Sequence, residues 1–286
     1  MMQNTPQKRV MAVHDISCFG RCSLTVALPI LSAAGLETSV IPTAVLSTHT
    51  GGFTGYTCRD LTDDILPIAK HWKSLGLRFD AIYTGYLGST RQLSLVSELI
   101  DDFRTEDSTV LVDPVMADHG KMYVHFDPAF AAGMAKLCAK ADIVVPNMTE
   151  AAFLLGETYH PGPHPREYVA GLLGRLCALG PKQAVVTGVL TDGGELGAAC
   201  LDTRTGALHF AFQEKIEGFY HGTGDVFGSA LLAALMNGRP LPKAAETAVR
   251  FTQRAIARTK AAGTDLRFGV DFEAELPALI KDLGIK

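Results

Sequence analysis

Short apolar runs recur along this chain at similar intervals and alternate with segments that have helical spacing. The runs are rich in Val, Ile, Leu and Ala and have no polar face, which is typical of strands covered on both sides. They lie at 10–13, 38–46, 80–87, 109–115, 142–147 and 183–188. The helical segments lie at 28–35, 62–76, 91–103, 127–140 and 166–180. This alternation predicts an α/β fold with a doubly wound, mostly parallel sheet and helices on both faces.

The pattern changes after Val189. Two apolar stretches flank the turn DTRTG and predict a hairpin, so we expect the sheet to end in antiparallel strands, followed by a mostly helical remainder. The Pro-rich segment YHPGPHP at 159–165 is the one candidate linker, but the alternation resumes beyond it, which favours a surface loop. We therefore expect a single domain over residues 1–286.

Composition limits the classes of partner. Lys and Arg total 26 against 30 Asp and Glu, a net charge of −4, so no general positive field exists to attract nucleic acid or an anionic membrane. The most apolar stretch, 24–36, is too short to span a bilayer and contains Pro29, and the first residues lack an apolar signal segment. These features predict a cytoplasmic protein with reduced cysteines.

Polar residues follow several of the predicted strands. In open α/β sheets ligands bind beyond the carboxyl ends of the strands, so these residues are candidates for a site. They are Tyr86, Asp113, Asp118, Asn147, Glu150 and Thr187. Asp113, Asp118 and Glu150 would supply the oxygen ligands that Mg²⁺ prefers alongside waters and substrate phosphates. Each has a simpler interpretation: a turn before Pro114, or a cap for the following helix.

The segment HGTGDVFGSALLAALMNG predicts a helix that starts beside Asp225. Gly222, Thr223 and Gly224 allow backbone N–H groups to turn toward an anion, and the helix N-terminus adds positive potential. Asp225 could accept a proton from a substrate hydroxyl while these amides stabilise a phosphoryl group.

This segment has two other interpretations. Asp225 could simply cap its helix. A dinucleotide-binding fingerprint fits poorly, because Phe227 stands at the third glycine position and the segment comes late in the chain. A Walker A loop is also absent from the sequence, so a nucleotide would be held by another design.

Together, GTGD before a late helix, DPVMADHGKMY, PNMTEA, TGYLGS and LSTHTGG resemble the ribokinase superfamily, specifically its pyridoxal (vitamin B6) kinase branch, from about Val10 to about Lys260. The resemblance implies a ribokinase-like fold and a homodimer that uses ATP with Mg²⁺, and often K⁺, to phosphorylate a B6 vitamer.

The resemblance also implies residue roles. Asp225 matches the catalytic base, with Gly222, Thr223 and Gly224 as the anion hole. Three acidic positions match residues around the magnesium: Asp113, Asp118 and Glu150. Asn147 and Thr187 match contacts to the ATP phosphates. Thr50 and Tyr86 match positions that line the pyridine ring, and Tyr123 matches a tyrosine near the substrate and ATP.

Two positions depart from the family pattern. Ala117 replaces a usual Gly in the magnesium loop, which matters if that Gly has a positive φ. Asp15 lies where most members have a substrate-binding Ser, and Ser17 follows two residues later, so either could contact the ring. The alternative is that Asp15 caps a turn and His14 packs in the core.

The function predicted from the sequence is transfer of the ATP γ-phosphoryl group to the 5′-hydroxymethyl group of pyridoxal, pyridoxine or pyridoxamine. The alternatives are a hydroxymethylpyrimidine kinase and a non-catalytic vitamin-binding protein. The first usually carries a Gly-Gly-Ala-Gly segment in the first loop, which DISCFGRCSL lacks. The second is disfavoured by the retained acidic residues.

Overall fold

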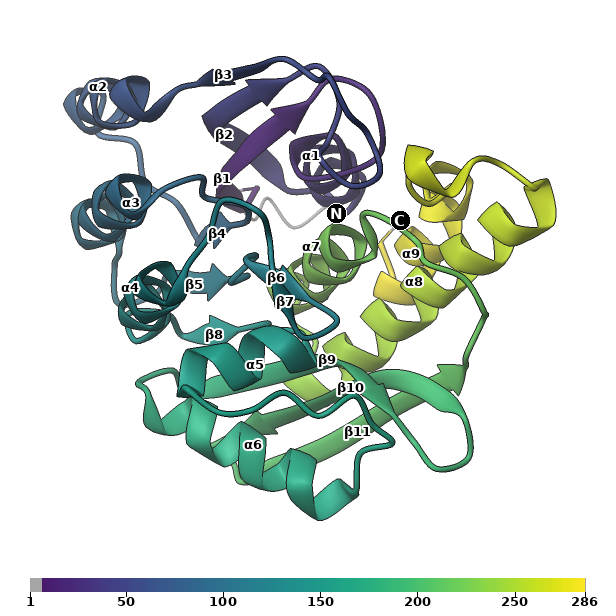
Figure 1. Ribbon diagram of the computed structural model, residues 1–286. Helices are drawn as coiled ribbons and strands as arrows, with labels where there is room; N and C mark the ends of the chain where they lie inside the picture. The colour runs from purple at the N-terminus through teal and green to yellow at the C-terminus, as the bar shows by residue number, and fades with distance from the viewer. Residues whose placement is uncertain (1–6, 286) are drawn as a thin grey trace, which may run out of the picture.

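A single twisted sheet forms the centre of the computed structural model, which describes residues 7–285 and in them nine sheet strands (Figure 1). Their spatial order is β11-β10-β9-β8-β5-β4-β1-β2-β3. The strands are β1 (Arg9–Ser17), β2 (Glu37–Leu46), β3 (Cys58–Asp60), β4 (Ala81–Thr84), β5 (Thr109–Val112), β8 (Ile143–Val144), β9 (Gln183–Leu190), β10 (Glu195–Asp202) and β11 (Ala207–Glu214). A separate hairpin pairs β6 (Ala117–Asp118) with β7 (Lys121–Met122).

The six strands from β9 to β2 in this order run parallel, as the apolar runs predicted. Strands β10 and β11 form the predicted hairpin and make that end of the sheet antiparallel. The short antiparallel strand β3 at the other edge was not predicted, because its three residues are all exposed and carry no apolar signal.

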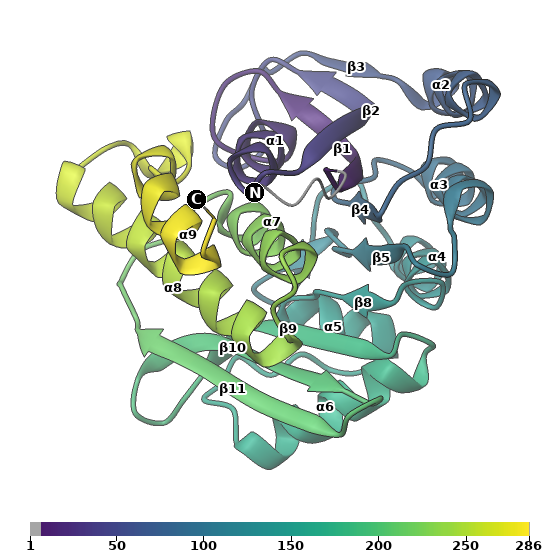
Figure 2. The same cartoon turned by 180° about the vertical axis from the view of Figure 1, so that it is seen from behind.

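Helices cover both faces of the sheet (Figure 2). The helices are α1 (Leu24–Ala33), α2 (Thr62–Ser74), α3 (Thr90–Phe103), α4 (Pro128–Cys138), α5 (Met148–Leu155), α6 (Arg166–Ala178), α7 (Thr223–Met236), α8 (Leu241–Ala262) and α9 (Leu276–Leu283), with 3-10 turns at Leu266–Phe268 and Glu273–Glu275. One core joins the sheet to α1, α7, α8 and α9, and the other joins it to α2 through α6. The doubly wound α/β prediction is confirmed.

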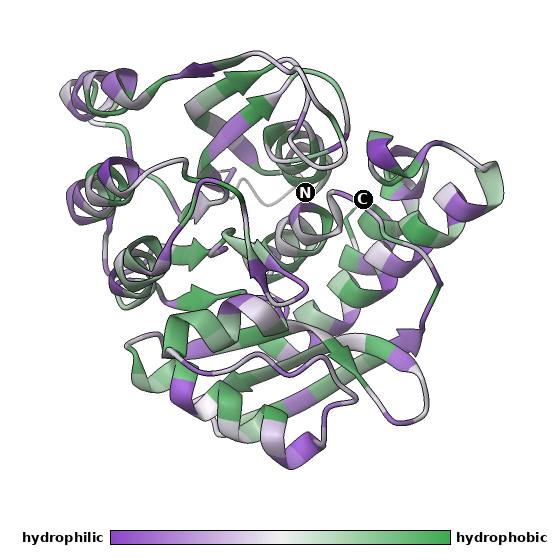
Figure 3. Ribbon diagram, in the orientation of Figure 1, coloured by the Kyte–Doolittle hydropathy of each residue, from purple (hydrophilic) through white to green (hydrophobic). Residues whose placement is uncertain are grey.

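Strand β1 shows why the apolar runs lack a polar face. Val10 packs in the α1/α7 core, whereas Met11 and Val13 pack in the opposite one, so alternate side chains are buried on both sides. Figure 3 shows the same distribution, with mostly hydrophobic strands and hydrophilic residues on the outer sides of the helices. Within residues 7–285, no helix combines the length and apolar character needed to cross a membrane.

Candidate active site

The start of helix α7 is open to a ligand. Gly222 precedes the helix with φ +76°, and a Cβ there would overlap the carbonyl oxygen of Arg21, so this position requires glycine. No side chain of the described residues caps the helix, and the space above Gly224 is empty. Thr223 Oγ1 instead donates to the carbonyl of Tyr220 at 3.2 Å. The first amides of α7 are therefore available to an anion.

Asp225 lies in the first turn of this helix and is partly buried. Burial raises the pKa of Asp225 to about 7, and the charge of Asp15 contributes to the rise. The Ser23 backbone has the opposite effect and lowers this pKa. A general base works best with a pKa near the working pH, because it is then both ionised and basic. The geometry thus gives Asp225 the proton affinity that its predicted role needs.

Asp113 and Glu150 form a buried acidic pair across the same edge of the sheet. Burial raises the pKa of Asp113, and the charges of Glu150 and Asp225 raise it further. Glu150 accepts hydrogen bonds from the amides of Met116 at 3.1 Å and Asn147 at 2.8 Å, yet burial still raises its pKa. Carboxyl groups held this close favour a divalent cation, which would relieve their mutual repulsion.

Asp118 lies further out than this pair. Its side chain is 37% exposed and accepts the amide of His119 at 2.8 Å. Among residues 7–285, no three His, Cys, Asp or Glu side chains come close enough to hold a metal by themselves. The donor set therefore fits a Mg²⁺ that keeps waters and arrives with nucleotide phosphates, and the metal roles of Asp113, Asp118 and Glu150 stay predictions.

The hairpin of β6 and β7 carries Asp118 over the sheet edge. Its turn residues, His119 and Gly120, have φ of 49° and 75°, as the tight turn of a two-residue hairpin requires. Ala117 has no positive φ, so replacing the family's usual Gly causes no backbone strain. Beyond the hairpin, Tyr123 is 41% exposed, and burial followed by the charges of Glu150, Asp118, Asp113 and Asp225 raises its pKa. Tyr123 is therefore close to all the predicted acidic residues.

Asn147 and Thr187 are neighbours on the adjoining strand ends, where the amide of Thr187 donates to Pro146 O at 3.0 Å. Directly after Thr187 the register of β9 against β10 shifts at Gly188, which has φ +74°. Such bulges are common beside active sites because they redirect the strand. This bulge was not predicted from the sequence.

Besides Tyr123, the predicted substrate residues come from three segments. Asp15 and Ser17 are buried at the end of β1, and the Ser17 hydroxyl donates to Asp15 Oδ2 at 3.2 Å. Burial and then the charge of Asp15 raise the pKa of Tyr86 to about 12, which places Tyr86 beside Asp15. Thr50 is exposed on the loop between β2 and β3.

His14 packs in the core, as the alternative interpretation expected. It is fully buried edge-on against Tyr83, with ring centroids 4.5 Å apart, and burial lowers its pKa to about 3. The turn-capping role considered for Asp15 is less well matched, because its side chain accepts the Ser17 hydroxyl and no backbone amide of the described residues.

Three further residues shape the site and were missed in the sequence. Ser23 contacts both Asp15 and Asp225 and has φ 54°, which is uncommon for a residue with a side chain. His221 packs directly on Gly51, so the loop that carries Thr50 lies against the start of α7. Buried Gln92 accepts the amide of Gly88 at 2.7 Å and holds the segment after Tyr86. His221 opens the HGTGD segment but had no predicted role, Ser23 and Gln92 belong to no motif, and only the fold brings the three to the site.

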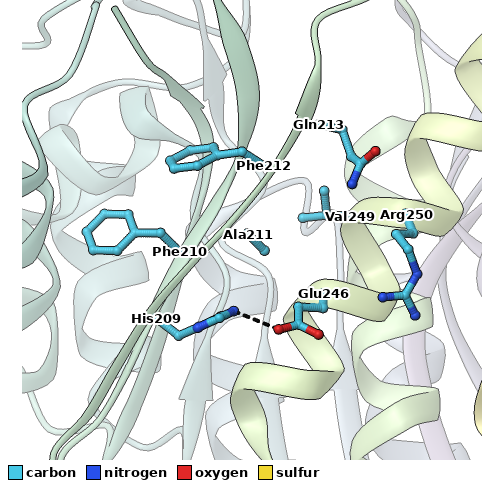
Figure 4. A pocket seen from close by; sticks show the side chains of 8 residues that line it. All are labelled: His209, Phe210, Ala211, Phe212, Gln213, Glu246, Val249 and Arg250. Carbon is cyan, nitrogen blue, oxygen red and sulfur yellow. Dashed lines mark ion pairs between the residues drawn. The ribbon is translucent and has the colours of Figure 1, made fainter. Parts of the chain in front are cut away.

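Two cavities lie away from these residues. One of about 270 Å³ lies between β11 and α8 (Figure 4). There His209 Nε2 lies 3.0 Å from Glu246 Oε1, while Phe210 and Phe212 point to the other face of the strand under Arg166. The other, of about 600 Å³, is a mostly apolar groove between α4 and α5. Neither contains a predicted site residue.

The comparisons with known proteins agree with the geometry. A sequence model described as phosphomethylpyrimidine kinase matches residues 31–268. The chain is 30% identical to a pyridoxal kinase of Arabidopsis thaliana over 90% of this chain and 85% of that protein. The solved structure of a Bacteroides thetaiotaomicron protein, described as a phosphomethylpyrimidine kinase and determined with pyridoxal, has a TM-score of 0.92 and 38% identity, covering 96% of each chain. Pyridoxal kinase from Lactobacillus plantarum has a TM-score of 0.87 and 32% identity, covering 97% of this chain and 98% of its own. The chain belongs to the pyridoxal kinase branch of the ribokinase superfamily.

Proposed function

We propose that this protein transfers the γ-phosphoryl group of ATP to the 5′-hydroxymethyl group of a B6 vitamer. The observation that carries the proposal is Asp225, a carboxyl group with a pKa near 7 in the first turn of an uncapped helix. The base for the hydroxyl and the amides for the phosphoryl group are thus a single structural unit.

In the proposed reaction Asp225 takes the proton of the 5′-hydroxyl group as its oxygen attacks the γ-phosphorus. The bond from that phosphorus to the β-phosphate oxygen breaks, and ADP leaves. The amides at Gly222, Thr223 and Gly224 would stabilise charge on the transferred group. The products are the 5′-phosphate and ADP, with the proton on Asp225.

Asp113, Asp118 and Glu150 would hold Mg²⁺, directly or through its waters, and the ion would neutralise phosphate charge. Asn147 and Thr187 would contact the nucleotide from the strand ends. Thr50, Tyr86, Tyr123, Asp15 and Ser17 would surround the ring. The homodimer and the use of K⁺ stay predictions from the family resemblance, and the cytoplasmic location stays a prediction from the sequence features.

A hydroxymethylpyrimidine kinase is the second candidate, because the matching family model bears the phosphomethylpyrimidine kinase description. Both substrates are aromatic rings with a hydroxymethyl group, so Asp225 could serve either. The names of the relatives and the pyridoxal in the Bacteroides structure support the vitamer.

The deciding experiment measures ADP release with pyridoxal, pyridoxine, pyridoxamine and hydroxymethylpyrimidine, with and without Mg²⁺. We expect kcat/KM for at least one vitamer to exceed that for hydroxymethylpyrimidine. Preference for the pyrimidine would favour the second candidate, and no turnover of any substrate would favour a non-catalytic binding protein.

A further inference from the structure

The carboxyl group of Asp15 is buried with half of its hydrogen-bonding capacity unused. The residue is 4% exposed, and its Oδ2 accepts the Ser17 hydroxyl at 3.2 Å. Its Oδ1 is buried and has no partner in the described chain. The pairing of β1 with β2 shifts register beside Asp15, an irregularity of the kind that redirects a side chain near a site.

Ser23 connects Asp15 to the catalytic carboxyl group. It lies close to both groups, because its side chain lowers the pKa of Asp15 and its backbone lowers the pKa of Asp225. One residue therefore lies between the two carboxyl groups. The φ of 54° at Ser23 is costly for a residue with a side chain, and such strain concentrates at functional sites.

The backbone before Ser23 is also fixed. Arg21 forms ion pairs with Asp271 at 2.9 Å and Glu273 at 2.7 Å, and its carbonyl oxygen packs against Gly222. The two carboxyl groups are thus held in place by the fold.

Among residues 7–285, no positive charge acts on the pKa of Asp15. The groups that hydrogen-bond it or interact with its charge are Ser17, Ser23, Cys22, Cys58, Tyr86 and Asp225. His14 is adjacent in sequence but is neutral, because burial lowers its pKa to about 3. A buried carboxylate without a partner is unfavourable, so this position gains from a ligand that brings a positive charge.

We propose that Asp15 selects substrates with a protonated amine on the carbon next to the one that bears the reacting hydroxymethyl group, as in pyridoxamine. This inference rests on the proposed function. If Asp225 contacts the 5′-hydroxyl group, Asp15 on the other side of Ser23 is placed for the neighbouring 4′ substituent. An ammonium group there would donate to Oδ1 in a charge-assisted hydrogen bond, roughly twice as strong as a neutral one.

Pyridoxine provides the matched comparison, because it has the same ring nitrogen but a 4′-hydroxymethyl group in place of the aminomethyl group. We expect the wild type to show a kcat/KM for pyridoxamine about tenfold or more above that for pyridoxine. In Asp15→Asn, which keeps the shape and removes the charge, this ratio should fall by about tenfold. Asp80→Asn is the control: Asp80 is exposed directly before β4, at the opposite end of the parallel strands, and its Oδ2 accepts the Arg9 amide, which Asn can also accept. Its ratio should equal that of the wild type.

Each outcome decides the inference. An unchanged ratio of kcat/KM for the two substrates in folded Asp15→Asn overturns the inference. This includes an equal loss on both substrates, which is what pairing of Asp15 with the ring nitrogen would give. A wild-type ratio of one or less also overturns it, even if the variant does not fold. Absence of turnover with every vitamer would overturn the proposed function and this inference together, so the two failures are distinguishable.

Discussion

Helices α5 and α7 both begin at the carboxyl edge of the sheet, but their N-termini are built in opposite ways. At α5, Asn147 Oδ1 accepts the amides of Thr149 and Glu150 at 2.8 and 2.9 Å, and Glu150 returns a bond to the Asn147 amide. This capping box satisfies the helix internally. At α7, Gly222 provides no side chain and the amides stay free. The same type of helix start is structural in one case and open to a ligand in the other.

The difference explains why short motifs alone could not distinguish a helix-capping acid from the predicted catalytic base. An acidic residue occupies the first turn of both helices. Glu150 uses both oxygens on backbone amides, whereas Asp225 receives one backbone bond from Ser23 and lies beside Asp15. The two acids therefore differ in how many hydrogen-bond partners the fold gives them, and this difference sets the predicted reactivity of Asp225.

Replacing the base should give the largest effect. We expect Asp225→Asn to lower kcat by about 100-fold or more while nucleotide binding is retained, since Asn caps a helix as well as Asp. Above pH 7 the wild type holds a carboxylate that burial disfavours, so the variant should melt no lower than the wild type at pH 8. Near-normal turnover would remove Asp225 from the catalytic step.

The pH dependence tests the same residue without a substitution. Asp225 accepts a proton only when ionised, and burial raises its pKa to about 7. The logarithm of kcat/KM should therefore fall by one per pH unit below about 7, that is, about tenfold, and level off above it. A fall of kcat/KM centred near pH 4 would show that the environment at the start of α7 does not raise the pKa of Asp225.

Removing the exposed acid should have an intermediate effect. Asp118→Asn should raise the Mg²⁺ concentration for half-maximal activity several-fold, because a neutral amide is a poorer ligand for the ion or its waters. Asp127→Asn is the matched control, since Asp127 is exposed and caps α4, as Asn can also do. Equal Mg²⁺ dependence in wild type and both variants would remove Asp118 from the metal site.

The cap of α5 should give the smallest effect on turnover. Asn147→Ala removes two acceptor contacts and the Nδ2 bond to Ala117 O at 2.8 Å, so unfolding free energy in urea should fall by about 1 kcal/mol. Asp127→Ala removes the cap of α4 and should cost a similar amount. If Asn147 also contacts ATP, only Asn147→Ala raises KM for ATP. The same KM in both variants would leave Asn147 as a cap alone.

The sequence by itself determined the α/β class, the order of parallel strands and helices, and the acidic residues at the strand ends. It could do so because strands buried on both faces must be apolar throughout, and ligand-binding polar residues must follow them. Asp225 and its glycines were visible because a positive φ and an open helix start need a particular local composition.

Only the tertiary structure decided how these residues act. Ser23 lies close to Asp15 and Asp225 because its backbone has a positive φ, which a serine does not predict. Gly188 marks a bulge that depends on pairing with β10. The proton affinity of Asp225 likewise depends on burial and on a charge 210 positions earlier in the chain, at Asp15. Such effects arise from desolvation and distance between segments remote in sequence, which no local pattern encodes.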